Sequence, residues 1–430
     1  MATLFQRQWP RWAVCWLLLC QIQALSIIDR TLYGNWLGKP GDVFTQFTNI
    51  SQIIMSVILF GIGARRWSSL RHGATLTLCL AVYLLLSAAW SVDPGATIRT
   101  GISYFFFILG LIGAAENLEG DDFFNLLASV CFLSAIASLI LLFISPSLAD
   151  GGTGDFIGIF SYKNILGQAM AVGSLACLHG LRAQTRSRLS SLFMILVFTF
   201  VALKCRSTTS ALVILLFYVL GAVIQLLQKG GGARILGVVL LTLLLIVAPV
   251  AAISLDSLLE LMGKDPTLTG RTDIWGYVTP YIYQRPWLGW GYSAFFSTLN
   301  PAAWEVANTL HWFAPEAHNG LLDILLSGGL VGAVWFVYLW LRTVRLSLRC
   351  MRYDSPMATT CFSCCAGILV EGVSEQVLLY ATGLAGVFFI TGFFCEKAVS
   401  RARRRTPVAH GNLVGTHSAH IAPSAATAKF

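Results

Sequence analysis

Long apolar runs, separated by short connectors, follow one another along almost the whole chain. A run of about 20 apolar residues is the length that crosses a bilayer as a helix. Only 11% of the residues are charged and 56% are hydrophobic, whereas a soluble domain carries roughly 25% charged residues. The pattern therefore predicts an all-α integral membrane protein with about 12 transmembrane helices. The expected spans are 11–28, 46–63, 73–90, 99–115, 123–145, 161–180, 190–204, 208–228, 234–254, 318–341, 357–373 and 376–394.

This spacing leaves no room for a separate soluble domain, so residues 1–400 are expected to form one polytopic membrane domain. Residues 401–430 are the exception. Most of this segment is rich in Ala, Pro, Ser, Thr and His and has no periodicity, which predicts a disordered tail.

Basic residues mark one side of the predicted bundle, because cytoplasmic connectors carry an excess of Lys and Arg. An even number of spans then places both termini in the cytoplasm. The acidic connector 116–122 falls on the same side, but acidic residues weigh little in this rule. The net charge of +9 is spread over connectors and forms no aromatic-interleaved basic face, so nucleic acid binding is not expected. The connectors that set the orientation contain Arg65, Arg66, Arg71, Arg182, Arg186, Arg188, Lys229, Arg234, Arg342, Arg345, Arg349, Arg352, Arg401, Arg403, Arg404 and Arg405.

One large polar segment interrupts the apolar pattern, between the ninth and tenth expected spans. It covers about 255–317 and concentrates Arg, His, Asp, Glu, Trp and Tyr. The predicted orientation turns it outward, which in a double-membraned bacterium is the periplasm. A membrane protein that builds one such loop is expected to work there.

Several positive charges lie at the outward ends of the spans, where an ionisable residue is costly and suggests function. Arg206 and Arg271 are the foremost, and Lys163 and Lys204 lie nearby. A guanidinium group pairs bidentately with phosphate oxygens, so these positions suit a lipid phosphate or diphosphate. No Asp-x-Asp pair lies in the outward connectors, so no metal is expected and no cofactor is predicted.

His318 is the expected general base, because an imidazole can take up a proton near neutral pH. Glu316 is placed to orient it, and His311 is a competing candidate. Asn319 is expected either in the site or as the cap of the tenth span. The loop tryptophans, including Trp275 and Trp290, suit either stacking on sugar faces or anchoring at a membrane interface.

These residues resemble the O-antigen ligase and polymerase superfamily of bacterial envelope glycosyltransferases. The resemblance covers most of residues 75–395 and rests on motifs in a fixed order. They are Trp90–Pro94, Phe160–Gly167 with Lys163 and Asn164, Gly270–Trp275, Pro286–Gly291, His318–Gly320 and Gly329–Gly332.

The resemblance implies a C-type glycosyltransferase fold that moves a glycan from undecaprenyl diphosphate to an acceptor in the periplasm, without metal. Arg271 would engage the diphosphate, and His318 would activate the acceptor hydroxyl. A second family arginine usually lies in a Ser-Arg-Thr-like stretch. Here the arginine precedes the serine, so either Arg206 fills the role, or Lys204 or Lys163 supplies the second charge.

The single large loop and the short tail favour an O-antigen ligase of the bacterial inner membrane, with lipid A–core oligosaccharide as the acceptor. A polymerase acting on lipid-linked glycan and a transferase acting on protein are the alternatives within the family. A transporter of lipid-linked glycan is the alternative from another class, although such proteins usually carry polar residues at mid-membrane and internal repeats.

Overall fold

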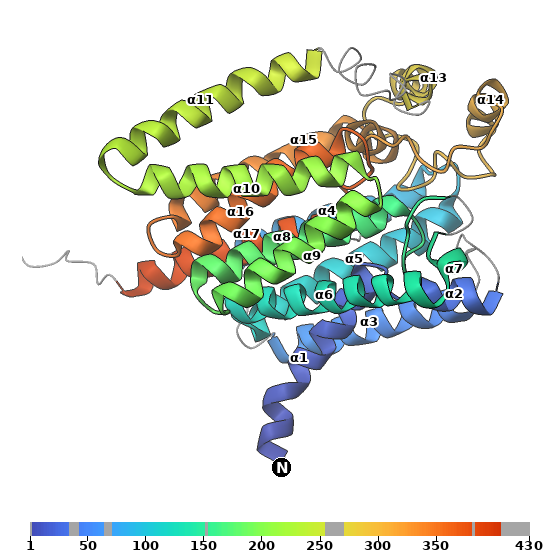
Figure 1. The fold of residues 1–430 in the computed structure, drawn as a ribbon. Coiled ribbons are helices and arrows are strands. Elements are labelled where there is room, and N and C mark those ends of the chain that lie inside the picture. Colours follow the sequence, from blue (N-terminus) through green and yellow to red (C-terminus); the bar gives the residue numbers. More distant parts are fainter. Residues whose placement is uncertain are drawn as a thin grey trace, which may run out of the picture.

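Helices make up the regular secondary structure of a computed structural model, which describes residues 2–33, 43–63, 71–150, 154–253, 271–380 and 383–405. Most long helices run side by side in one bundle (Figure 1). The predicted all-α fold is confirmed for the described residues. The helices are α1 (Ala2–Gln21), α2 (Ser26–Tyr33), α3 (Val43–Gly63), α4 (Arg71–Leu86), α5 (Pro94–Asn117), α6 (Gly120–Ile144), α7 (Pro146–Asp150), α8 (Lys163–Ala183), α9 (Arg188–Lys204), α10 (Thr208–Gln228), α11 (Gly231–Ile253), α13 (Arg271–Gln284), α14 (Pro301–Leu310), α15 (Gly320–Cys350), α16 (Ser355–Gly372) and α17 (Gly383–Arg405), with the short 3-10 helix η2 (Ser87–Ala89) after α4.

Within the described ranges, seven helices are long and apolar enough to cross a membrane. They are α3, α4, α5, α6, α10, α15 and α17. Large apolar side chains such as Phe143 and Leu189 point outward from the bundle, as expected for a surface covered by lipid tails rather than water. The seven helices make this a candidate multi-pass membrane protein, and the count of about 12 spans stays a prediction.

The last helix, α17, begins and ends at other residues than predicted. A span was expected over 376–394, but residues 373–380 form a non-helical turn and α17 begins only at Gly383. The predicted start is therefore wrong by seven residues, because the apolar run Val377–Leu379 extends the hydropathy signal across a turn. Helix α17 also continues to Arg405, past the expected start of the tail at 401. Residues 406–430 lie outside the described part of the chain.

The acidic connector between α5 and α6 pairs with basic side chains from distant segments. Arg401 holds Glu119 through two hydrogen bonds of 2.7 and 2.8 Å, and Arg11 lies 2.9 Å from Asp122. Hydrogen bonding to Arg401 is the main reason why the pKa of Glu119 lies below its ordinary value. These acidic residues therefore form ion pairs with basic residues of α1 and α17 at this end of the bundle.

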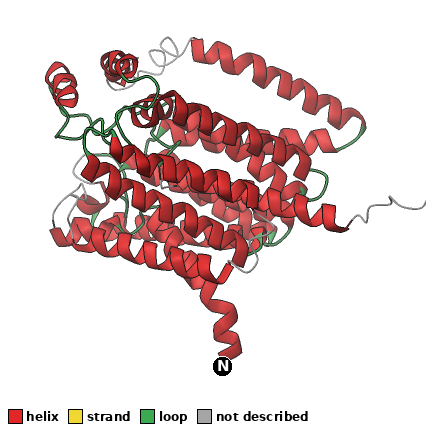
Figure 2. Ribbon diagram, turned by 180° about the vertical axis from the view of Figure 1, so that it is seen from behind, coloured by secondary structure: helices red, strands yellow, loops and turns green. Residues whose placement is uncertain are grey.

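The described part of the predicted loop 255–317 is a small folded unit. Its two helices, α13 and α14, stand at the end of the bundle opposite the acidic connector (Figure 1), among the loops drawn green in Figure 2. Residues 254–270 lie outside the described ranges. The unit has an apolar core of its own, formed by Ile274, Val278, Ile282, Trp290, Phe295, Ala302, Val306, Ala314, Ala317 and Leu326.

Two glycine motifs join this unit to α15. At Gly329 the helix leaves helical geometry, with φ 61° and ψ −162°. The amide of Leu330 then donates to the carbonyl of Pro286 at 2.8 Å, and the amide of Trp290 donates to the carbonyl of Leu326 at 2.6 Å. Gly289, at φ 69°, lies directly against the same stretch. At the kink, backbone hydrogen bonds within α15 are therefore replaced by backbone hydrogen bonds to the loop unit.

Candidate active site

Several of the residues that the sequence singled out meet where helix ends converge. Helices α8, α10, α13 and α15 begin there, and α16 ends there. The N-terminus of a helix carries unpaired amide groups and a partial positive charge. Four such ends around one place favour a negatively charged ligand.

His318 lies in the turn before α15 and has a positive φ of 48°, which is uncommon for a residue with a side chain. Several bonds hold this turn. The amide of Ala317 donates to a carboxylate oxygen of Asp323 at 3.1 Å, and Trp275 Nε1 donates to the carbonyl of Ala317 at 3.0 Å. Asn319 caps α15 by accepting from the amides of the second and third helical residues. The imidazole is therefore placed by the fold and not only by its own contacts.

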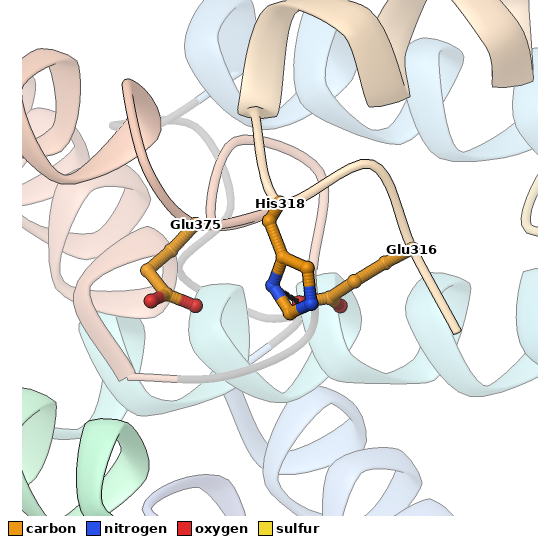
Figure 3. Close-up of side chains that lie close together, drawn as sticks. All are labelled: Glu316, His318 and Glu375. Atoms are coloured by element: carbon orange, nitrogen blue, oxygen red, sulfur yellow. Dashed lines mark ion pairs between the residues drawn. The ribbon is translucent and has the colours of Figure 1, made fainter. Parts of the chain in front are cut away.

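Glu316 lies beside His318, as Figure 3 shows. Its Oε1 is 2.8 Å from His318 Nδ1, but this approach does not have the alignment of a regular hydrogen bond. In a neutral imidazole, a proton on Nδ1 would face this carboxylate and leave Nε2 as the accepting nitrogen. The predicted orienting role of Glu316 agrees with this position.

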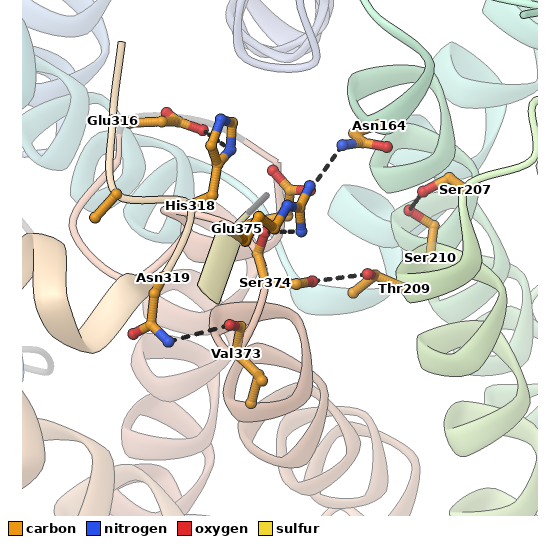
Figure 4. A network of polar contacts seen from close by, with 12 residues as sticks. Asn164, Ser207, Thr209, Ser210, Glu316, His318, Asn319, Val373, Ser374 and Glu375 are labelled. Carbon is orange, nitrogen blue, oxygen red and sulfur yellow. Dashed lines mark hydrogen bonds and ion pairs between the residues drawn. The ribbon is translucent and has the colours of Figure 1, made fainter. Parts of the chain in front are cut away.

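Arg271, the first residue of α13, binds the turn between α16 and α17. Its Nη2 donates to Glu375 Oε1 at 2.9 Å, and its Nη1 donates to the carbonyl of Ser374. The side-chain Nδ2 of Asn164 donates to the same Glu375 oxygen at 2.7 Å (Figure 4). Both partners of the ion pair are largely buried, with 17% and 11% of the Arg271 and Glu375 side chains exposed. Glu375 therefore joins two predicted site residues from different helices.

Burial is the main influence on Glu375 and raises the pKa of its carboxyl above its ordinary value of 4.5. The positive charge of Arg271 acts in the opposite direction, Glu316 raises the pKa further and His318 lowers it. The four groups are thus electrostatically linked.

Neighbouring segments fix the turn that carries Glu375. Thr209, near the start of α10, shares a hydrogen bond of 2.7 Å with Ser374. Asn319 Nδ2 donates to the carbonyl of Val373 at 3.1 Å. Both contacts appear in Figure 4. Asn319 therefore caps α15, as predicted, and also holds the turn that carries Glu375. Its role in substrate binding stays a prediction.

One imidazole nitrogen and two carboxylate oxygens, from His318, Glu316 and Glu375, lie within 4.8 Å of one another. This spacing alone would admit a cation. The guanidinium of Arg271 already supplies a positive charge to Glu375. We therefore assign no metal to this group of residues.

Three predicted cations lie outside this cluster. Lys163 pairs with Asp155 at 2.8 Å. Lys204 and Arg206 are exposed at the turn between α9 and α10 and make no side-chain hydrogen bond or ion pair with the described residues. Arg206 also has a positive φ of 56°. The choice among these three for a second phosphate-binding charge stays open.

The aromatic candidates and the competing histidine take different places. Trp290 is only 8% exposed, packs in the loop core and donates to the carbonyl of Tyr281. Its ring is also covered by Arg285 at 4.2 Å, so this conformation leaves no free face for a sugar. Trp275 holds the His318 turn as described above. His311 is exposed at the end of α14 and is not part of the cluster.

Sequence reasoning missed Glu375 and its neighbour Ser374. The signal was present in the run Glu371–Gln376, which places two acidic residues at the junction of two apolar segments. Ionisable residues at such a position mark functional sites. The junction was read only as a span boundary.

Comparisons with known proteins agree with the resemblance seen in the sequence. Residues 191–337 match a family model described as O-Antigen ligase. The chain is 26% identical over 139 residues to a general O-oligosaccharyltransferase of Acinetobacter baylyi, covering 32% of this chain and 24% of that protein. It is 25% identical over 272 residues to the exopolysaccharide production protein ExoQ of Rhizobium meliloti, covering 60% of each. The matched segments thus span less than two thirds of either relative.

Proposed function

We propose that this chain, whose residues 191–337 match the O-antigen ligase family model, is an inverting glycosyltransferase that uses a lipid diphosphate-linked glycan. The proposed donor is O-antigen polysaccharide on undecaprenyl diphosphate, and the proposed acceptor is lipid A–core oligosaccharide. The observation that carries the proposal is the cluster of Arg271, Glu375 and His318. In this cluster Glu375 contacts both a guanidinium group and the surroundings of an imidazole, which are the groups that the proposal assigns to phosphate binding and to proton transfer.

The proposed reaction is a single displacement. His318 Nε2 takes the proton of the acceptor hydroxyl while that oxygen forms a bond to the anomeric carbon of the donor. The bond from this carbon to the diphosphate breaks, and the diphosphate leaves with the electron pair. The proton then passes from the imidazolium to water. Attack opposite the leaving group inverts the configuration at the anomeric carbon.

Charge develops on the leaving diphosphate and has to be stabilised. Arg271 lies largely out of water, where a charged hydrogen bond is stronger than at the surface. The N-termini of α8, α10, α13 and α15 add partial positive charges on the same side. Glu316 stabilises the imidazolium that forms when His318 accepts its proton.

The proposed orientation follows from the two ends of the bundle. The basic residues Arg182, Arg186, Lys229 and Arg342 belong to the end opposite the His318 cluster. By the positive-inside rule that end faces the cytoplasm, as do both termini. The site then faces the periplasm across the inner membrane, where it would meet both lipid substrates.

A second candidate is a polymerase that extends lipid-linked glycan. It is favoured by the match to the exopolysaccharide production protein, which covers more of this chain than the match to the oligosaccharyltransferase. The same base and cation would serve both reactions, because only the acceptor differs. A protein acceptor is the third alternative within the family.

The test mixes the purified full chain in detergent with undecaprenyl diphosphate-linked glycan, lipid A–core and excess chelator. A higher-mass lipopolysaccharide product supports the ligase, whereas a ladder of longer lipid-linked glycan supports the polymerase. His318→Ala is expected to abolish either product. His311→Ala is the matched control, because this histidine belongs to the same loop unit but lies outside the cluster, and it is expected to retain activity.

Retention of the anomeric configuration, or full activity of His318→Ala, would contradict the mechanism. Movement of labelled lipid-linked glycan across vesicles without any covalent product would instead favour the transporter.

A further inference from the structure

Glu375 occupies the space that the proposed reaction needs. Its carboxylate contacts Arg271, and one of its oxygens lies within 4.8 Å of a nitrogen of His318. The reacting carbon of the donor has to lie between the cation that holds the diphosphate and the base that activates the acceptor. A donor therefore cannot take up its reactive position while Glu375 keeps the place shown in Figure 3.

The carboxylate is bound in the way a phosphate oxygen would be bound. Glu375 Oε1 accepts one hydrogen bond from the guanidinium of Arg271 at 2.9 Å and one from the side-chain Nδ2 of Asn164 at 2.7 Å. A phosphate oxygen uses the same two kinds of donor. Displacing this carboxylate would therefore give a lipid phosphate both donors together.

We infer that Glu375 is a displaceable counter-ion of Arg271, which a lipid phosphate has to displace before it can bind. This inference rests on the proposed function and assigns an internal competitor to the same site.

The counter-ion lowers the affinity of every ligand of Arg271 by one common factor. A ligand that binds Arg271 has to replace a carboxylate that already neutralises it in a largely buried place. The free energy needed to break this ion pair is subtracted from the binding free energy of a lipid diphosphate and of a lipid monophosphate alike. Removal of the carboxylate charge should therefore tighten the binding of both.

The turn that carries Glu375 has supports that do not involve the carboxylate. Asn319 and Arg271 donate to the carbonyls of Val373 and Ser374, and Thr209 shares a hydrogen bond with the Ser374 hydroxyl. Rotation of the Glu375 side chain alone would therefore vacate the space between Arg271 and His318 while the turn keeps its place.

The experiment measures the dissociation constants of undecaprenyl diphosphate and undecaprenyl phosphate with the full chain in detergent. Glu375→Gln keeps the shape of the side chain and removes its charge. We expect it to bind the diphosphate about tenfold more tightly than the wild type, as an ion pair of this kind allows, and to bind the monophosphate more tightly by a similar factor. Glu375→Asp keeps the charge and is expected to retain the weaker binding of the wild type.

Two further variants isolate the cause. In an Arg271→Gln background, Glu375→Gln is expected to change nothing, because the cation that it neutralises is absent. Glu371→Gln removes a buried carboxyl one turn earlier in α16 and is the matched control, with no tightening expected. Melting temperatures of all variants exclude a loss of folding.

Equal or weaker diphosphate binding by a folded Glu375→Gln variant would overturn the inference and would make Glu375 a residue that positions Arg271. The outcome is separable from the proposed function. If no acceptor receives glycan but the binding pattern appears, the counter-ion stands and the transferase does not. If transfer occurs and the binding pattern is absent, only the counter-ion is refuted.

Discussion

Replacing Gly329 with alanine is expected to disrupt the backbone contact between the loop unit and α15. The new Cβ would lie 2.3 Å from the carbonyl carbon and oxygen of Trp287. Ordinary contact begins at 3.4 Å, so one of the two segments has to move by about 1 Å. The backbone of Gly329, at φ 61° and ψ −162°, is also a conformation that is almost restricted to glycine.

The expected loss in free energy of unfolding follows from these contacts. The backbone conformation contributes about 1–3 kcal/mol. Separation of the segments weakens the bonds from Leu330 to Pro286 and from Val331 to Trp287, at about 1 kcal/mol each. The sum is about 3–5 kcal/mol, which corresponds to a melting temperature lower by roughly 3–6 °C for a chain of this length. Because the same loop unit carries Arg271, a shift of about 1 Å is expected to slow transfer by about a hundredfold.

Gly332→Ala is the matched control, on the same helix and three residues away. Its Cβ would meet Tyr83 at 3.7 Å and Ile324 at 3.9 Å, both ordinary contacts. The expected change is neutral or stabilising by up to about 1 kcal/mol. The measurements are thermal melting in detergent and the rate of glycan transfer for both variants. Equal melting and equal rates for Gly329→Ala and wild type would refute the interlocking of the two motifs.

Three further predictions concern other contacts. Asp323→Ala removes the acceptor for the Ala317 amide and is expected to lower the turnover number by about tenfold or more with little change in KM; a pure rise in KM would contradict this positioning role. Trp275→Phe keeps the apolar ring but loses the bond to the Ala317 carbonyl, at a cost of about 1 kcal/mol in unfolding free energy measured by denaturant titration; an unchanged midpoint would show that this bond does not contribute. Glu119→Gln removes the ion pair with Arg401 and is expected to lower the melting temperature at pH 7. Because the pKa of Glu119 is lowered in the fold, its contribution is present above its ordinary value of 4.5 and is lost as the pH falls through the folded pKa. The difference from wild type should therefore shrink below pH 4.5, and a constant difference would argue against the ion pair.

Much of the class and several site residues could be predicted from the sequence. The apolar runs are a local signal, because each helix carries the residues that face lipid or core within its own segment. Local patterns also placed functional weight on Arg271 and His318, and the family resemblance did so for Asn164; the structure brings these three residues to one turn through Glu375. The local patterns failed at the boundary of α17, where an apolar turn has the hydropathy of a span.

The aromatic residues show why a motif does not reveal its own purpose. Trp290 suits a sugar platform as well as a core, and only its packing against Phe295 and Tyr281 decides the matter in this conformation. Likewise, the Pro286–Gly291 and Gly329–Gly332 motifs are readable as a resemblance. Their physical purpose is visible only where the two backbones meet.

The sequence by itself determined the membrane class, the orientation expected from its charges and the residue types available for phosphate binding and proton transfer. These follow from composition and from patterns within single segments. The tertiary structure alone decided that Glu375 lies against Arg271, 104 residues away in the chain, and that the same carboxylate lies beside His318. The physical reason is that the pairing of a carboxylate with a guanidinium leaves no periodic trace in the sequence. It arises only when the ends of α8, α13, α15 and α16 are packed together.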